Sequence, residues 1–152
     1  MTITPSNLRR LAALAAATAT IAAAAAPAPA AAKTINVTED ASLHLTRRNG
    51  STLYERGTAR GTISGPVTAV FNVGITRVTG KVTVFSGRNA LTFTLSGTPT
   101  GQRGPRATFK GTMRVVGGTR RYRNASGTAT FTGTVNRRTW AATVRASGRL
   151  SY

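Results

Sequence analysis

Apolar and polar residues alternate with a period of two along most of the chain after residue 42. In one segment Leu91, Phe93 and Leu95 are separated by Thr92 and Thr94. Because successive side chains of a strand point to opposite faces of a sheet, this period predicts strands with one buried face. The alternation recurs in eight segments, near residues 42–46, 59–64, 67–73, 82–84, 91–95, 107–115, 128–135 and 139–150. We therefore expect antiparallel strands over most of residues 42–150, and no helix longer than two turns after residue 33.

Turn-forming residues separate these segments. Asn49-Gly50 is a hairpin signal, because both residue types accept the positive φ of a type I′ turn. Gly65-Pro66, Ser86-Gly87 and residues 136–138 mark further breaks. The segment richest in Gly and Pro is 97–105 (GTPTGQRGP), and we expect it to form the longest loop.

The number of predicted strands favours a closed barrel, because closure removes the unpaired edges of a sheet. The predicted inner face mixes Gly and Ala with Phe, Met and Trp, which is how a small barrel fills its interior. The outer face carries Thr, Ser and basic residues, and a membrane barrel would place Arg60, Lys81, Arg114 and Arg145 in lipid. We expect an all-β fold, an eight-stranded antiparallel soluble β-barrel.

The first 32 residues have the composition of a secretory signal peptide. A basic start ending in Arg9-Arg10 precedes a short, Ala-rich apolar run and small residues at A-x-A spacing. The run is too short and too weakly apolar for a membrane anchor. We expect cleavage after Ala32, with Ala28 and Ala30 as alternatives, and a single barrel domain at residues 33–152. The expected product is secreted and does not span a membrane after cleavage. Arg9-Arg10 leaves the twin-arginine route open, but the Leu-Ala-Ala that follows matches that pattern poorly and favours the general secretory route.

Residues 117–127 (GGTRRYRNASG) form a local motif between two predicted strands. Gly117-Gly118 permits a sharp reversal, and Tyr122 provides an aromatic plug for a barrel end. The segment resembles the GGTGxFxxAxG turn of the allene oxide cyclase and dirigent barrel superfamily, with matches at Gly117, Gly118, Thr119, Tyr122, Ala125 and Gly127. Arg120 stands where that family usually has a third Gly.

The resemblance extends loosely over residues 58–150, and the chain looks like the small exported barrels that high-GC bacteria encode. It implies an eight-stranded antiparallel barrel that is often a homotrimer. Plant members use acidic residues in the barrel mouth, but those positions do not carry over, because no acid follows Glu55 in this chain. The resemblance therefore implies a fold and leaves the chemistry open.

Composition excludes several kinds of active site. The chain has no Cys, one His and only three acidic residues, Glu39, Asp40 and Glu55. Thiol nucleophiles, disulfides, Cys-based zinc sites and multi-His metal sites are therefore impossible, and we expect neither metal nor cofactor. A Ser-His-Asp arrangement can be drawn around His44 and Asp40, but His44 falls on the polar face of its strand, and we interpret it as a solvated residue. We expect no catalytic residue.

Basic residues dominate the charge. There are 21 Lys and Arg residues, and the formal net charge is +18. Such a field attracts polyanions, and Arg suits bidentate contact with phosphate and carboxylate. Teichoic acid, acidic polysaccharide and extracellular DNA are candidate partners of a bacterial exported protein, without sequence-specific nucleic-acid recognition. The candidate contact residues lie in two predicted turns, at Arg120, Arg121, Arg123, Arg137 and Arg138.

A stripe of aromatic residues shares the predicted inner face. It comprises Phe71, Phe93, Phe109, Phe131 and Trp140, which form either a packed core or the wall of an apolar pocket.

Two functional hypotheses follow from the charge and from the aromatic stripe. The first is a non-enzymatic exported barrel that associates weakly with polyanions. The alternative is an isomerase or a dirigent-type coupling-directing protein with an apolar barrel pocket. A hollow interior with Glu39, Asp40, Glu55 or His44 pointing into it would favour the alternative.

Overall fold

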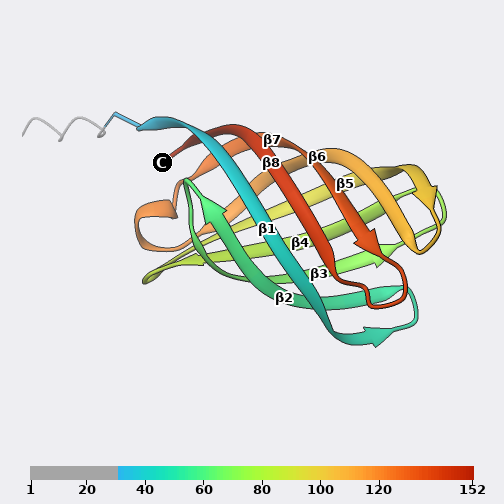
Figure 1. Ribbon diagram of the computed structural model, residues 1–152. Coiled ribbons are helices and arrows are strands. Elements are labelled where there is room, and N and C mark those ends of the chain that lie inside the picture. Colours follow the sequence, from blue (N-terminus) through green and yellow to red (C-terminus); the bar gives the residue numbers. More distant parts are fainter. Residues whose placement is uncertain (1–30) are drawn as a thin grey trace, which may run out of the picture. The chain divides into compact units, whose positions relative to one another are not determined.

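The computed structural model describes residues 31–152, which form one compact unit. Eight antiparallel strands follow one another around a closed barrel, and β8 pairs with β1 (Figure 1). The all-β prediction and the eight-stranded closed barrel are therefore confirmed. The strands are β1 (Thr34–Asn49), β2 (Thr52–Gly61), β3 (Gly65–Val73), β4 (Val78–Ser86), β5 (Asn89–Arg103), β6 (Arg106–Gly118), β7 (Ser126–Asn136) and β8 (Ala142–Ser151). The predicted signal peptide, residues 1–32, lies almost entirely outside the described residues.

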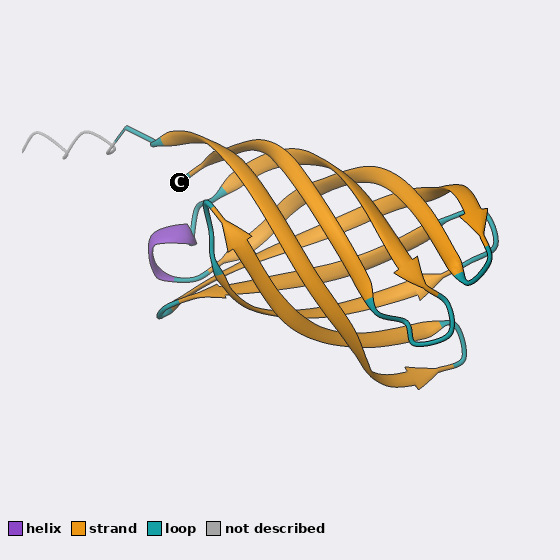
Figure 2. Ribbon diagram, viewed as in Figure 1, coloured by secondary structure: helices purple, strands orange, loops and turns teal. Residues whose placement is uncertain are grey.

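The connections divide the barrel into two ends, which we name after their aromatic residues. The Trp140 end carries the connections at residues 50–51, 74–77, 104–105 and 137–141. The Tyr122 end carries those at 62–64, 87–88 and 119–125, together with the two ends of the barrel chain at Lys33 and Tyr152 (Figure 2). In residues 31–152 we find no helix with the length and apolar character needed to cross a bilayer.

Aromatic side chains fill the barrel interior where facing positions are glycine. A Cβ atom at Gly80 would lie 2.6 Å from Phe71 Cδ1, so the missing side chain makes room for that ring. Phe131 occupies the space beside Gly97 and Gly111, where Cβ atoms would lie 2.9 and 2.8 Å from its Cζ. The alternation of small and large inner residues that the sequence displays is therefore reciprocal packing across strands.

The prediction of a long loop at residues 97–105 is wrong. β5 continues to Arg103 and pairs with β6 through Gly97↔Gly111 and Pro99↔Phe109, leaving only residues 104–105 as the turn. A register shift between Pro99 and Gly101 absorbs the irregularity that proline introduces. Gly and Pro mark a bulge and a close packing contact here, and the tight turn contains Gly104 at φ +58°.

Three strand boundaries also differ from the sequence-based expectation. β1 begins at Thr34, eight residues before the predicted start, and pairs with β8 over that stretch. Ile63 was expected in a strand with Ala59, but it lies after the end of β2 and is nevertheless 2% exposed. Trp140 was expected in the last strand, whereas it lies in the β7–β8 connection with φ +59°. Its amide donates to the carbonyl of Asn136, so a turn hydrogen bond replaces strand pairing.

The motif at residues 117–127 closes one end of the barrel. Arg120–Tyr122 form one turn of 3₁₀ helix, and Tyr122 is 1% exposed with its ring edge-on to Tyr152 at 5.0 Å. The backbone N–H of Thr119 donates to the carbonyl of Ala90, and the Ala90 N–H donates to Thr119 Oγ1, which fixes the turn against the start of β5. Arg120 adopts φ +52°, a left-handed conformation that glycine adopts at less cost than other residues.

Candidate functional site

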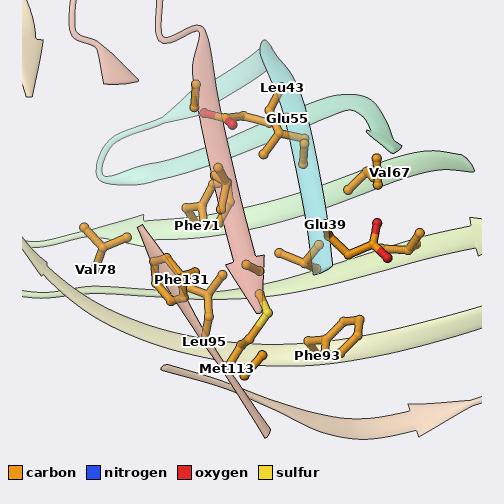
Figure 3. Close-up of a pocket in the computed structure, with 18 of the residues that line it drawn as sticks. Glu39, Leu43, Glu55, Val67, Phe71, Val78, Phe93, Leu95, Met113 and Phe131 are labelled. Atoms are coloured by element: carbon orange, nitrogen blue, oxygen red, sulfur yellow. The ribbon is translucent and has the colours of Figure 1, made fainter. Parts of the chain in front are cut away.

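The barrel interior contains an apolar cavity of about 140 Å³. Strands from all around the barrel contribute to its wall, including Leu43 from β1, Val78 from β4 and Met113 from β6 (Figure 3). The volume is close to that of an engineered apolar protein cavity of about 150 Å³ that binds benzene. The interior is therefore incompletely filled by side chains, and the space fits a molecule of roughly one ring.

All five aromatic residues proposed from the sequence line this cavity: Phe71, Phe93, Phe109, Phe131 and Trp140. Phe131 is 3% exposed and meets Phe109 edge-on, with 6.0 Å between the ring centroids. Trp140 reaches the cavity from the turn at the Trp140 end, where it is half-buried. The aromatic stripe is thus partly core and partly cavity wall.

Glu55 is the most unusual side chain of the wall. It lies on β2 between Leu53 and Gly57, points into the barrel, and is 3% exposed (Figure 3). Its Oε2 atom is buried and has no hydrogen-bond partner among the described residues. Desolvation by burial raises the pKa of Glu55 to about 7. The carboxyl group can therefore gain or lose a proton near neutral pH, and it has unused hydrogen-bonding capacity facing the cavity.

Glu39 provides a second carboxyl group in the wall. It lies on β1, and its Oε1 atom accepts a hydrogen bond from the backbone N–H of Ile63. Its Oε2 atom is also buried without a partner in the described part of the chain. Burial raises the pKa of Glu39, and the neighbouring charge of Asp40 adds to this effect, whereas the Ile63 and Thr62 amides oppose it. Glu39 is therefore held by the backbone, unlike Glu55.

The two carboxyl groups are too far apart to act together. Glu39 pairs with Gly61, and Glu55 is six residues before Gly61 on β2, which corresponds to about 20 Å along the strand. Two-carboxylate glycoside hydrolysis requires groups roughly 5–9.5 Å apart. Each glutamate must therefore act alone, and single-site proton transfer is the chemistry that this wall supports.

The remaining polar candidates lie outside the barrel. His44 is exposed on β1 opposite Arg56, and the described residues contain no cluster of His, Asp and Glu suited to a metal ion. Asp40 is exposed and forms an ion pair with Arg145, with 2.7 Å between Oδ1 and Nε. Of the three acidic residues, two therefore face the interior and the third is neutralised.

The five arginines proposed from the sequence fall into two groups. Arg120, Arg121 and Arg123 lie at the Tyr122 end, and Arg137 and Arg138 lie at the Trp140 end, as the single strand between the two turns predicts. The Arg121 guanidinium stacks on Tyr122 at 4.6 Å and on Tyr152 at 5.7 Å, and it donates to the Tyr122 hydroxyl. Arg137 Nη1 donates to Gln102 Oε1 at 2.9 Å. All five are exposed; Arg121 and Arg137 make these side-chain contacts, whereas Arg120, Arg123 and Arg138 have no side-chain partner within residues 31–152.

Sequence reasoning did not place Glu55 inside the barrel. A signal was present, because Leu53, Glu55, Gly57 and Ala59 share one period-two face of the chain. The predicted inner face begins at Ala59, and an acidic residue at an inner position departs from the usual pattern of burial. An acidic residue in register with apolar positions on both sides is the signal that would have found it.

In comparisons with known proteins, no family model, curated protein or solved structure matches the chain.

Proposed function

We propose that the barrel interior binds a small apolar molecule and that Glu55 exchanges a proton with it. The observation that carries the proposal is the unpartnered carboxyl oxygen of Glu55, buried in the wall of an apolar cavity of about 140 Å³. Burying such a group without a partner is unfavourable, so a ligand that supplies a hydrogen-bond donor or an acidic proton would satisfy it. This geometry favours the isomerase alternative over a purely structural barrel.

The chemistry is a proton transfer by one group. An ionised Glu55 removes a proton from one atom of the ligand, and the protonated carboxyl group returns it to another atom, which leaves the ligand isomerised and the enzyme unchanged. A general base works best when its pKa lies near the working pH, and burial brings Glu55 to about 7. Such catalysis contributes typically 10²- to 10⁴-fold in rate.

The proposed family and location agree with this function. The closed eight-stranded barrel and the motif at residues 117–127 support membership of the allene oxide cyclase and dirigent barrel superfamily, in which homotrimers are common. The Ala-rich start of the chain supports export and cleavage near Ala32. β1 begins at Thr34, so each of the three cleavage points considered leaves the barrel whole.

The test is a proton-transfer reaction on a probe that fits the cavity. Cyclohex-3-enone rearranges to cyclohex-2-enone by losing a proton from the carbon between the carbonyl and the alkene and gaining one at the far alkene carbon. The rearrangement is followed by absorbance. We expect the protein to accelerate it relative to buffer, with a rate that rises as pH passes through about 7. Glu55→Gln should abolish the acceleration, and Asp40→Asn, which removes the exposed acid, should not. Equal rates for the wild type and Glu55→Gln would overturn the proposal.

A second candidate function is weak association with anionic polymers such as teichoic acid, acidic polysaccharide or DNA. The observation that favours it is the separation of charge. Glu39 and Glu55 face the interior and Asp40 pairs with Arg145, so the exposed basic residues have almost no competing acid. The unengaged turn arginines at the Tyr122 end, Arg120 and Arg123, are the contacts to test first.

The salt dependence of binding distinguishes arginines that contact an anionic polymer from arginines that only keep the protein soluble. Log affinity for duplex DNA should fall linearly with log salt, with a slope of about −0.9 for each phosphate neutralised. Replacing Arg120 and Arg123 by Gln should flatten the slope by about 2, because Arg121 is held by Tyr122 and Tyr152. An unchanged slope would assign the two arginines to solubility.

A further inference from the structure

We propose that the ligand of the barrel is a small apolar molecule with an anionic head group, and that it binds through the Trp140 end with the head among the arginines of that rim. The proposal rests on the proposed interior site and adds the chemical class of its ligand. It joins two features that lie at the same end of the barrel, the aromatic part of the cavity and a ring of basic residues.

The Tyr122 end is closed by packed side chains. Tyr122 and Leu91 are 1% and 0% exposed, and Ile63 and Leu150, which line the cavity on that side, are each 2% exposed. Access from this end would require the 3₁₀ turn and its hydrogen bonds to Ala90 to separate from β5.

The Trp140 end is less tightly packed. Four cavity residues next to its connections are half-buried, Val73, Val78, Val135 and Trp140, whereas Leu53 and Ala142 at the same end are 3% and 6% exposed. Trp140 sits in a turn with φ +59°, outside the strand ladder. Displacing this turn would break its own backbone hydrogen bonds, which join Asn136 to Ala141, Arg137 to Pro105 and Trp140 to Asn136, but it would leave the ladder of β8, which begins at Ala142. The Trp140 end is therefore the end through which a ligand reaches the cavity.

Basic side chains surround this end. The Arg48 guanidinium lies over the Trp140 ring at 5.0 Å from its centroid, and Arg47 lies over Tyr54 at 4.1 Å. Arg137 and Arg138 belong to the same connection as Trp140. Exposed basic residues also flank the neighbouring turns, at Arg77, Arg103 and Arg106. None of the chain's three acidic residues lies in a connection at this end, so the rim has a strong positive potential next to an aromatic wall.

The spacing sets the length of the ligand. Glu55 is three residues from the start of β2 at Thr52, which corresponds to about 10 Å along the strand. A head group bound by the rim arginines would therefore place a body of one ring and two or three carbons beside Glu55. The cavity of about 140 Å³ accepts a body of this size and excludes a long acyl chain. The same spacing keeps the anionic head away from the Glu55 carboxyl group.

Three probes that share one apolar body test the head group. These are 3-phenylpropionate, 3-phenylpropan-1-ol and 3-phenylpropylammonium, measured by calorimetry at low salt and by the fluorescence of Trp140, the chain's only Trp. We expect the carboxylate to bind at least tenfold more tightly than the alcohol, and the ammonium to bind most weakly. This preference should shrink at high salt, because exposed charges are screened.

Matched charge variants locate the head group. Arg48→Gln combined with Arg138→Gln should reduce the preference for carboxylate over alcohol three- to tenfold and leave alcohol binding within twofold. Arg88→Gln combined with Arg114→Gln removes the same charge from the Tyr122 end and the outer face of β6, and it should leave the preference unchanged. Far-UV circular dichroism of each variant shows that the barrel is intact.

The outcomes separate this proposal from the proposed function. Equal binding of the three probes, or an equal loss of preference in both double variants, overturns the anionic head group while leaving the interior site standing. If the alcohol itself does not bind, and Glu55→Gln changes neither probe binding nor the enone reaction, the interior site fails as well. A carboxylate preference that only the Arg48 and Arg138 variant removes supports the proposal.

Discussion

Replacing Glu55 by Gln should stabilise the protein at alkaline pH and leave its stability almost unchanged at acid pH. Gln has nearly the same shape as a protonated Glu and cannot ionise. In the folded protein Glu55 lies in an apolar wall with an unpartnered oxygen, so ionisation there is unfavourable. The substitution therefore removes an energetic penalty that exists only when the carboxyl group is charged.

The size and sign of the effect follow from the shift in pKa. Burial raises the pKa of Glu55 from 4.5 to about 7, and each pKa unit corresponds to about 1.4 kcal/mol. The folded state thus holds the proton more tightly than the unfolded chain does. The contribution of protonated Glu55 is complete below pH 4.5 and is lost as pH rises through about 7. Between pH 4 and pH 8 the wild type should lose about 3 kcal/mol of unfolding free energy that the Gln variant retains.

The measurement is urea unfolding of both proteins at pH 4, 5, 6, 7 and 8, followed by far-UV circular dichroism and by Trp140 fluorescence. The quantity of interest is the difference between the two unfolding free energies, because titration of all other groups cancels in it. Asp40→Asn is the control. Since Asp40 is exposed, this substitution should change the unfolding free energy only slightly and with a different dependence on pH. Parallel curves for wild type and Glu55→Gln from pH 4 to pH 8 would show that Glu55 is hydrated or hydrogen-bonded in solution, and the proposed proton transfer would lose its basis.

Further predictions concern the turns, the core and the start of the mature chain. Arg120→Gly should stabilise the barrel by up to about 1 kcal/mol, because Arg120 has φ +52°, whereas Arg123→Gly at φ −54° should destabilise it by about 0.5–1 kcal/mol; thermal unfolding of both variants tests the difference. Phe131→Ala should reduce the unfolding free energy by about 3–5 kcal/mol, because Phe131 is 3% exposed. Trp140→Ala should reduce it by clearly less, since Trp140 is half-buried in a turn, and equal losses in urea unfolding would place Trp140 in the core. N-terminal sequencing of exported protein should begin near Lys33, and a chain that still begins at Met1 would contradict the signal peptide.

The barrel was predictable because its determinants are local. Alternation of apolar and polar residues sets which face of each strand is buried, and this holds for Val67 and Ala69, which are buried, and for Phe71, which is half-buried, without knowledge of any partner strand. The long β5–β6 hairpin was not predictable in the same way. Gly97 and Gly111 are typical of breaks when considered locally, but a Cβ atom at either position would meet the Phe131 ring of β7 and the backbone of the paired strand. Long-range packing therefore accounts for the misplaced loop.

The candidate site was only half predictable for the same reason. The aromatic wall follows from period-two alternation, whereas the emptiness of the interior depends on the summed volumes of eight strands around a closed ring. Trp140 was assigned to a strand because its neighbours alternate, but the turn hydrogen bond to Asn136 takes it out of the ladder. Glu55 lies at an inner position of the alternation, but inner positions are usually apolar. A pattern that sorts residues into apolar and polar classes therefore leaves Glu55 out of the predicted inner face.

The distribution of the acidic residues has consequences for function. A chain with net charge +18 has abundant cations with which three acids could pair, yet within residues 31–152 only Asp40 does so, through Arg145. Glu55 instead lies where an apolar residue of similar size would stabilise the barrel at neutral pH, because an unpaired carboxylate in an apolar wall opposes folding. A residue that opposes folding at a position facing a cavity is typical of a functional site, where stability is given up for chemistry. Glu55→Leu should therefore raise the unfolding free energy at pH 8 and remove proton transfer together, a combination that a structural role for Glu55 does not predict.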